Sequence, residues 1–208
     1  MKAKINDKNF YYNELTKEIT EDILENLSLG IKYDQTQYHW PYHLKIDDEE
    51  EYLNFTYSVT RIPSEDFIKN DIVGSSGLDD FCLPHVTISM LIKEKKWIKN
   101  HSYTFSEIAG VVAHELHHLT QDFELSVMPT ENTPIVNYFL NPIEIEAFHI
   151  GFRAESSFSN TTIEMCIEKY LNNFLNNNSI NTKDYKKIFV KWLKPEIKLL
   201  KGASGNES

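Results

Sequence analysis

Apolar residues recur at helical spacing near the start of the chain, and a glycine follows them. The apolar positions are Leu15, Ile19, Ile23, Leu24 and Leu27. Residues three or four apart lie on one face of a helix, and Gly30 is typical of the position after a helix C-terminus. The pattern therefore predicts an amphipathic helix over about residues 13–28.

Two later segments have the pattern of β-strands. In LNFTYSV (53–59) apolar and polar residues alternate, which is typical of a half-buried strand. The run HVTISMLI (85–92) is rich in β-branched residues and follows the turn-rich sequence GSSGLDD (74–80). These segments predict a small sheet before residue 100.

Helical patterns dominate the rest of the chain. Thr104 and Glu107 have the form of a capping box and open the run FSEIAGVVAHELHHLTQDFEL (105–125), which predicts a helix of about twenty residues. Asn141 and Pro142 resemble an N-cap and first residue of a helix over about 142–155.

Two more helices are expected near the C-terminus. Thr161 and Glu164 form a second capping-box pattern, and apolar residues recur after it at helical spacing. A last helix is predicted over about 183–200, with an interruption at Pro195.

These elements predict an α+β fold, with a small sheet before a long helix and a mostly helical C-terminal half. We expect a single domain over 1–201, since 208 residues suit one hydrophobic core. It divides into a sheet-rich part (30–95), central helices (104–155) and C-terminal helices (161–201). The polar segment 202–208 is expected to be a disordered tail.

Composition and charge narrow the class of protein. The chain is 41% hydrophobic and carries a net charge of −10, which disfavours nucleic-acid partners. No apolar run approaches the roughly 20 residues of a membrane span, and the N-terminus lacks a signal-peptide pattern. Two cysteines, Cys82 and Cys166, form no disulfide framework. We therefore expect a cytoplasmic protein, with non-classical export as the alternative and no membrane partner.

The strongest chemical signal lies in residues 114–118, which read HELHH. His114 and His118 are four residues apart in a predicted helix, so both imidazoles can reach one ion, such as Zn²⁺. Glu115 can then act as the general base that takes a proton from water, as in metallopeptidases with the HExxH motif. We predict one zinc ion per chain.

A third ligand is needed, because catalytic zinc usually has three protein ligands and one open position. The segment NPIEIEAFHIG (141–151) offers Glu144, Glu146 and His149. We favour Glu144, since Ala147 and Gly151 beside it are small enough to let two helices approach closely. Glu146 stays open as the ligand, and Glu144 could instead close a capping box with Asn141.

Other polar residues near the motif have supporting roles in this hypothesis. His117 points about 100° away from His118 and is expected to contact an outer group or solvent. The residues that could orient a ligand imidazole are Gln121, Asp122, Glu124 and Glu146. The residues that could stabilise an oxyanion are His149, Tyr138, Arg153 and Tyr103, of which we favour His149.

The motifs HELHH and PIEIEAFHIG together resemble the gluzincin group of zinc metallopeptidases, in which HExxH and a glutamate from a following helix bind zinc. The element EIEAFHIG is similar to the ExxxD element of the Ste24/HtpX-like peptidases, which implies Glu144 as the ligand; Phe148 stands at the aspartate position. The absence of transmembrane helices makes the chain look more like a soluble minigluzincin. The resemblance implies a sheet on the HExxH helix with an edge strand that aligns an extended peptide, for which we expect His85–Ile92.

The sequence therefore favours a zinc endopeptidase acting on a peptide or protein substrate. Two alternatives remain open: a zinc-stabilised binding or structural protein without hydrolysis, and a phage or bacterial effector peptidase with one narrow substrate. The oligomeric state is not predicted.

Overall fold

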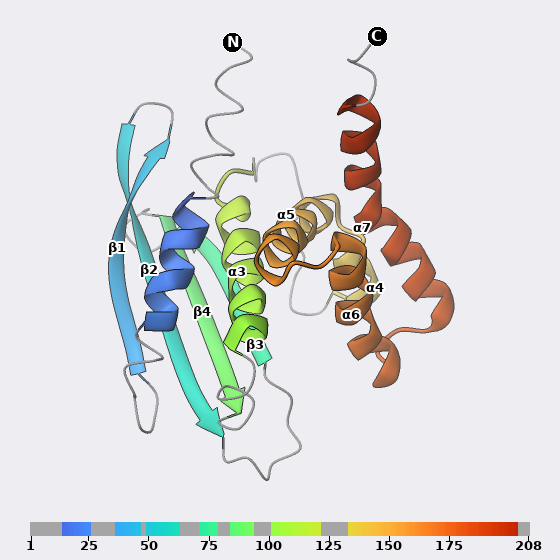
Figure 1. Ribbon diagram of the computed structural model, residues 1–208, viewed down its shortest axis with the longest axis horizontal. Helices are drawn as coiled ribbons and strands as arrows, with labels where there is room; N and C mark the ends of the chain where they lie inside the picture. Colours follow the sequence, from blue (N-terminus) through green and yellow to red (C-terminus); the bar gives the residue numbers. More distant parts are fainter. Residues whose placement is uncertain are drawn as a thin grey trace.

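The computed structural model describes residues 14–25, 36–46, 49–62, 71–78, 84–93, 101–121 and 133–203. The fold is α+β, as predicted, with a sheet on one side of a central helix and a group of helices on the other (Figure 1). The strands are β1 (Thr36–Ile46), β2 (Glu49–Ile62), β3 (Asp71–Leu78) and β4 (Pro84–Lys93). The helices are residues 14–25, α3 (His101–His118), α4 (Ile135–Phe139), α5 (Pro142–Ser159), α6 (Ile163–Asn176) and α7 (Thr182–Ala203).

The sheet has the strand order β1-β2-β4-β3. β4 runs parallel to β2 and antiparallel to β3, so it has a neighbour on each side. The expectation that His85–Ile92 is an edge strand is therefore wrong. The edge strands are β1 and β3. The β3 sequence DIVGSSGL includes the glycines and serines from which the sequence pattern predicts a turn. These residues form a strand because β4 supplies the hydrogen bonds, which outweigh their weak local preference.

A first hydrophobic core joins the sheet, the N-terminal helix and α3. Phe55 and Tyr57 of β2 are buried here, which confirms the inward face predicted from the alternation at these two positions. The buried members are Leu15, Ile19, Ile23, Phe55, Tyr57, Val86, Ile88, Met90, Ile108, Val112 and Leu116. This core fixes one side of α3 against the sheet.

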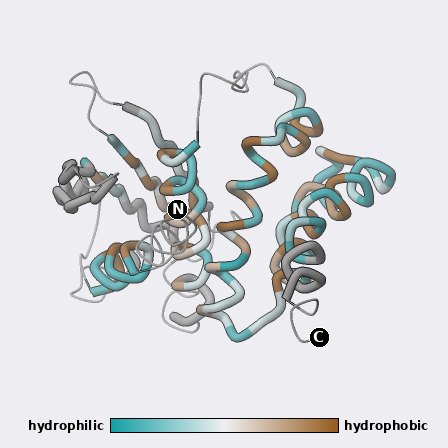
Figure 2. Tube along the Cα trace, turned by 90° about the horizontal axis from the view of Figure 1, so that it is seen from above, coloured by the Kyte–Doolittle hydropathy of each residue, from teal (hydrophilic) through white to brown (hydrophobic). Residues whose placement is uncertain are grey.

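A second hydrophobic core joins α4, α5, α6 and α7 and is rich in aromatic residues. Its buried members are Phe139, Phe148, Phe152, Cys166, Ile167, Leu171, Ile180, Ile188 and Trp192. Trp192 donates a hydrogen bond from Nε1 to the Phe139 carbonyl (2.8 Å) and stacks on Phe148 with ring centroids 4.4 Å apart. Figure 2 shows polar and apolar residues alternating along the C-terminal helices, as one buried face requires.

Several predicted helix boundaries differ from the structure. α3 already begins at His101, so Thr104 is not its N-cap, and Glu107 pairs instead with Lys169 (3.0 Å). Helix α3 also ends at His118 rather than near Leu125, and residues 122–125 lie outside the described residues. The N-cap of α6 is Thr162, one residue after the predicted Thr161, because its hydroxyl accepts from the Met165 N–H.

The C-terminal helix is longer than predicted. α7 continues through Pro195 and reaches Ala203, two residues into the predicted tail. Proline removes only the hydrogen bond to the Lys191 carbonyl, and Lys191 is exposed, so water can replace that partner. Residues 204–208 lie outside the described part of the chain.

Candidate metal centre

Three side chains from two helices converge between the two cores. His114 and His118 come from the last turns of α3, and Glu144 comes from the first turn of α5. All three are buried, with 9%, 5% and 3% of their surfaces exposed. Each offers a donor atom within 4.8 Å of the other two, so the group could hold a metal ion.

The spacing of the donor atoms suits one ion. His114 Nε2 and His118 Nε2 are 3.0 Å apart, and Glu144 Oε2 lies 3.5 Å and 3.7 Å from them. Four ligands about 2.05 Å from a tetrahedral ion stand about 3.3 Å from one another. The three separations in the structure bracket that value, so the triangle fits an ion without a change of backbone.

Glu144 has the properties of a ligand rather than of a helix cap. Asn141 caps α5 by accepting from the Ile143 N–H, and its own N–H donates to the Tyr138 carbonyl, so no capping box forms. Burial opposes ionisation, yet the nearby His114 and His118 side chains outweigh it and hold the Glu144 pKa at about 2. Its Oε2 is buried and lacks a hydrogen-bond donor of good geometry among the described residues. A bound cation would satisfy this orphaned oxygen.

Gln121 orients the second histidine. His118 Nδ1 is 2.7 Å from Gln121 Oε1, and Gln121 Nε2 donates to the Ile143 carbonyl (3.0 Å). Donation from Nδ1 leaves the lone pair of Nε2 directed at the other ligands. Burial lowers the His118 pKa, but interactions with Glu144 and Gln121 outweigh it and raise the pKa overall. Gln121 is thus one of the predicted orienting residues; Asp122 and Glu124 lie outside the described residues.

Two glycines allow α3 and α5 to approach closely. A Cβ added at Gly151 would stand 2.7 Å from the Gly110 carbonyl oxygen and 3.3 Å from His114 Cβ. A Cβ at Gly110 would stand 3.2 Å from the Gly151 carbonyl oxygen. The small residues at this crossing bring Glu144 within reach of the two histidines, as the sequence predicts for Ala147 and Gly151.

Glu115 lies on the part of α3 that meets the sheet, and it is still close enough to the triangle for its charge to act on His118. It is 6% exposed and accepts a hydrogen bond at Oε2 from Ser76 Oγ (2.8 Å) on β3. Beside it, a Cβ at Gly74 would stand only 2.4 Å from Glu115 Cγ. Sequence reasoning missed both β3 residues, and the period-two spacing of small residues at 74 and 76 was the available signal.

The predicted oxyanion-stabilising residues are not equally placed. Tyr138 of α4 interacts with Glu144. The Tyr138 pKa is raised, mainly by burial and to a smaller extent by the Glu144 carboxylate. His149 is buried with Nε2 3.6 Å from Glu196 Oε2 of α7, so its position gives the favoured oxyanion role no support. Arg153 is exposed, and the side chain of Tyr103 lies outside the described ones.

His117 and Glu146 stand outside the ligand group. His117 Nε2 is 4.0 Å from Glu146 Oε2, and Glu146 is exposed. The His117 pKa is lowered to about 4, mainly by burial. The nearby histidines His118, His114 and His149 lower it further. His117, Glu146 and His149 line a hollow of about 140 Å³ with Ile150 and Pro195.

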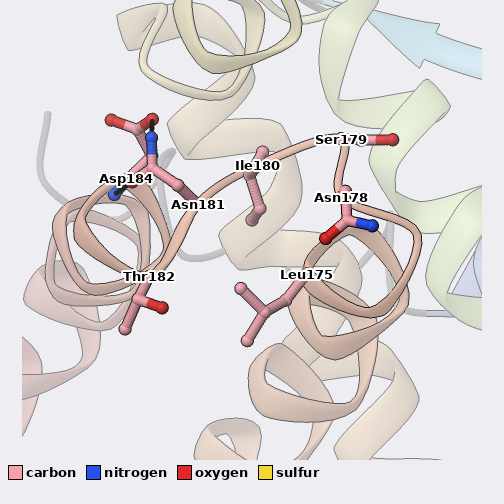
Figure 3. A pocket seen from close by; sticks show the side chains of 7 residues that line it. All are labelled: Leu175, Asn178, Ser179, Ile180, Asn181, Thr182 and Asp184. Carbon is pink, nitrogen blue, oxygen red and sulfur yellow. Dashed lines mark hydrogen bonds between the residues drawn. The ribbon is translucent and has the colours of Figure 1, made fainter.

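A larger hollow lies away from these residues. It has a volume of about 400 Å³ and sits at the turn between α6 and α7 (Figure 3). Asn181 in its wall is already engaged, because Oδ1 accepts from the Lys183 and Asp184 N–H groups and Nδ2 donates to Asp184 Oδ2. The size of this hollow therefore does not mark it as the functional site.

Comparisons with protein-family models, curated proteins and solved structures give no match for this chain. Within the described ranges, no helix combines the length and apolar character needed to cross a membrane. Any function must therefore be argued from the residues themselves.

Proposed function

We propose that this chain is a zinc-dependent endopeptidase whose metal ligands are His114, His118 and Glu144. The observation that carries the proposal is the buried donor triangle, with separations of 3.0, 3.5 and 3.7 Å. Imidazole nitrogens with one carboxylate oxygen are a typical donor set for catalytic zinc. A second carboxylate, that of Glu115, follows His114 directly in the sequence and accepts a hydrogen bond from Ser76 of β3.

Each residue has a separate task in this proposal. A zinc ion in the triangle would act as a Lewis acid toward the scissile carbonyl and make water more acidic. Glu115 accepts the proton of the attacking water and returns it to the leaving amine. Gln121 keeps the His118 ring oriented, and Tyr138, beside Glu144, is the residue best placed to donate to a developing oxyanion.

The test combines metal content with turnover. We expect wild-type protein, stripped and reloaded, to hold one zinc per chain and to cleave members of a mixed peptide library. Glu115→Gln should keep the zinc and lose turnover by about 10²–10⁴-fold, since general-base catalysis typically contributes that much. His118→Ala should lose the zinc itself. Full activity of zinc-loaded Glu115→Gln would reject Glu115 as the base.

A second candidate is a zinc-stabilised binding protein without hydrolysis, and one observation favours it. Phe148 contacts the His114 ring, with ring centroids 4.6 Å apart. In a catalytic site, a carboxylate at this place would accept a hydrogen bond from the ligand histidine and make it a stronger ligand. This candidate predicts a large fall in Tm on chelation and no cleavage of any library member. Cleavage that depends on Glu115 would exclude it, whether the substrate range is broad or limited to one protein.

A further inference from the structure

One wall of the site comes from a strand that has no recognisable motif. Ser76 of β3 donates its hydroxyl to Glu115 Oε2 at 2.8 Å, across 39 residues of sequence. Glu115 is 6% exposed, and this hydrogen bond is partly buried. Of the two carboxylate oxygens, Oε2 is therefore already engaged.

The other oxygen lies where a side chain at position 74 would be. A Cβ built on Gly74 would stand 2.4 Å from Glu115 Cγ, 2.5 Å from Oε1 and 2.8 Å from Cδ. Real Cβ atoms essentially never come this close to another heavy atom, so any residue but glycine would displace the carboxylate. Gly74 thus leaves the space that the Glu115 side chain fills.

The alternation of the strand gives these two residues a common direction. Gly74 and Ser76 are two apart and so lie on the same face of β3, whereas the exposed Val73 and Ser75 lie on the other face. Gly77 has no atom within 4 Å of an added Cβ. The strand therefore contains a glycine and a serine that contact Glu115, Gly74 and Ser76, and a second glycine and serine, Gly77 and Ser75, that lie on the other face.

We propose that β3 positions the general base. Ser76 holds Glu115 Oε2 by a hydrogen bond, and Gly74, which has no side chain, leaves the space in which the Glu115 side chain is held in one conformation. The inference rests on the proposed peptidase function and adds two positioning residues to it. A carboxylate held in this way leaves Oε1 as the proton acceptor, in one conformation rather than several.

The test uses matched pairs of variants of the full chain. Ser76→Ala and Gly74→Ala should lower kcat by roughly 10–100-fold with KM within about twofold and zinc unchanged, since supporting residues of a site typically contribute that much. Ser76→Thr keeps the hydroxyl and should restore kcat to within a few-fold of wild type. Ser75→Ala and Gly77→Ala should match wild type in kcat, zinc content and Tm. Wild-type kcat in Ser76→Ala would overturn the proposal, and Ser76→Ala decides alone if Gly74→Ala does not fold.

A structural readout separates this inference from the function on which it rests. If wild-type protein cleaves nothing, the peptidase proposal fails, but crystal structures of zinc-loaded Ser76→Ala and Gly77→Ala still test the positioning. We expect the Glu115 carboxylate to leave its place in Ser76→Ala and to keep it in Gly77→Ala. An unmoved carboxylate in Ser76→Ala would overturn the proposal regardless of activity.

Discussion

The two sides of α3 hold their functional residues by different physical means. On the helical side, His114 and His118 meet Glu144 through a close helix crossing that two glycines permit. On the sheet side, Glu115 contacts β3 in two ways. Its carboxylate accepts a hydrogen bond from the Ser76 hydroxyl, and its side chain fills the space that Gly74 leaves by having no side chain. Residues 114 and 118 share a helix face, whereas residue 115 is turned about 100° from residue 114. In the proposed mechanism, the HExxH spacing would therefore place the ion ligands against α5 and the proton acceptor against β3.

The largest effect should follow from breaking the helical side alone. Glu144→Gln removes the anionic ligand, so zinc affinity should fall by more than about 100-fold. That value is the largest loss typical of removing a residue that only supports a metal ligand. Glu146→Gln, on the same helix but exposed, is the matched control and should bind as wild type. Competition with a chromogenic chelator measures both, and equal losses in the two variants would reject Glu144 as the ligand.

The helix crossing can be opened without touching a donor atom. Gly151→Ala places a methyl group 2.7 Å from the Gly110 carbonyl oxygen, and backbone cannot move aside as a flexible side chain can. Overpacking of this kind typically lowers the free energy of unfolding by about 1–3 kcal/mol. Urea denaturation of Gly151→Ala beside Gly77→Ala, where the added Cβ meets nothing within 4 Å, checks this. Equal stability of the two variants would contradict a tight crossing.

A smaller change should follow when the outer partner of a ligand is removed. Gln121→Ala deletes the group that orients His118, so zinc affinity should fall by roughly 10–100-fold with the fold intact. Thr120→Ala, one residue away, removes an exposed hydroxyl that bonds the His117 carbonyl and should leave affinity unchanged. The same chelator competition distinguishes them, and wild-type affinity in Gln121→Ala would show that Gln121 does not orient the ligand.

The smallest effect concerns the pH dependence of stability in chelator-treated, metal-free protein. The Glu144 pKa is lowered to about 2 in the fold, so its contribution is present above 4.5 and is lost as pH falls toward 2. The His118 pKa is raised, so its contribution is present below 6.5 and is lost as pH rises through the raised value. The attraction between them should therefore stabilise the fold most between pH 4.5 and 6.5.

Denaturation of the metal-free protein at a series of pH values checks whether its stability is highest in this window. Glu144→Gln should flatten the profile on both flanks of that window, because it removes the carboxylate that shifts the His118 pKa. A profile as steep as that of wild type would show that the pair does not contribute to the stability of the metal-free state.

The sequence predicted those features that depend on local spacing. The α+β class, the helix at 14–25, strands β2 and β4, and the Asn141 cap of α5 all follow from periodicity or capping within a few residues. The two histidines and Glu144 also come together as expected, because small residues at the predicted positions allow the helices to approach.

What the sequence could not give are relations between distant segments. Nothing local marks Asp71–Leu78 as a strand, since its glycines and serines prefer turns and its pairing is supplied by β4. The bond from Ser76 to Glu115 and the ion pairs from Lys169 to Glu107 and Glu155 likewise depend on packing. The two predicted capping boxes also differ from the structure, because α3 begins at His101 and the N-cap of α6 is Thr162.

The aromatic stack of the second core reaches the candidate metal centre through Phe148. Trp192 stacks on Phe148, and Phe148 meets the edge of the His114 imidazole. An indole one ring away from a ligand is a natural fluorescent reporter, since its emission responds to the packing and electric field of its surroundings. The chain has two other tryptophans, Trp40 and Trp97, and replacing both by phenylalanine would leave Trp192 as the only tryptophan, which can be excited apart from the tyrosines. Loading and loss of the ion could then be followed by light, in real time and without a substrate.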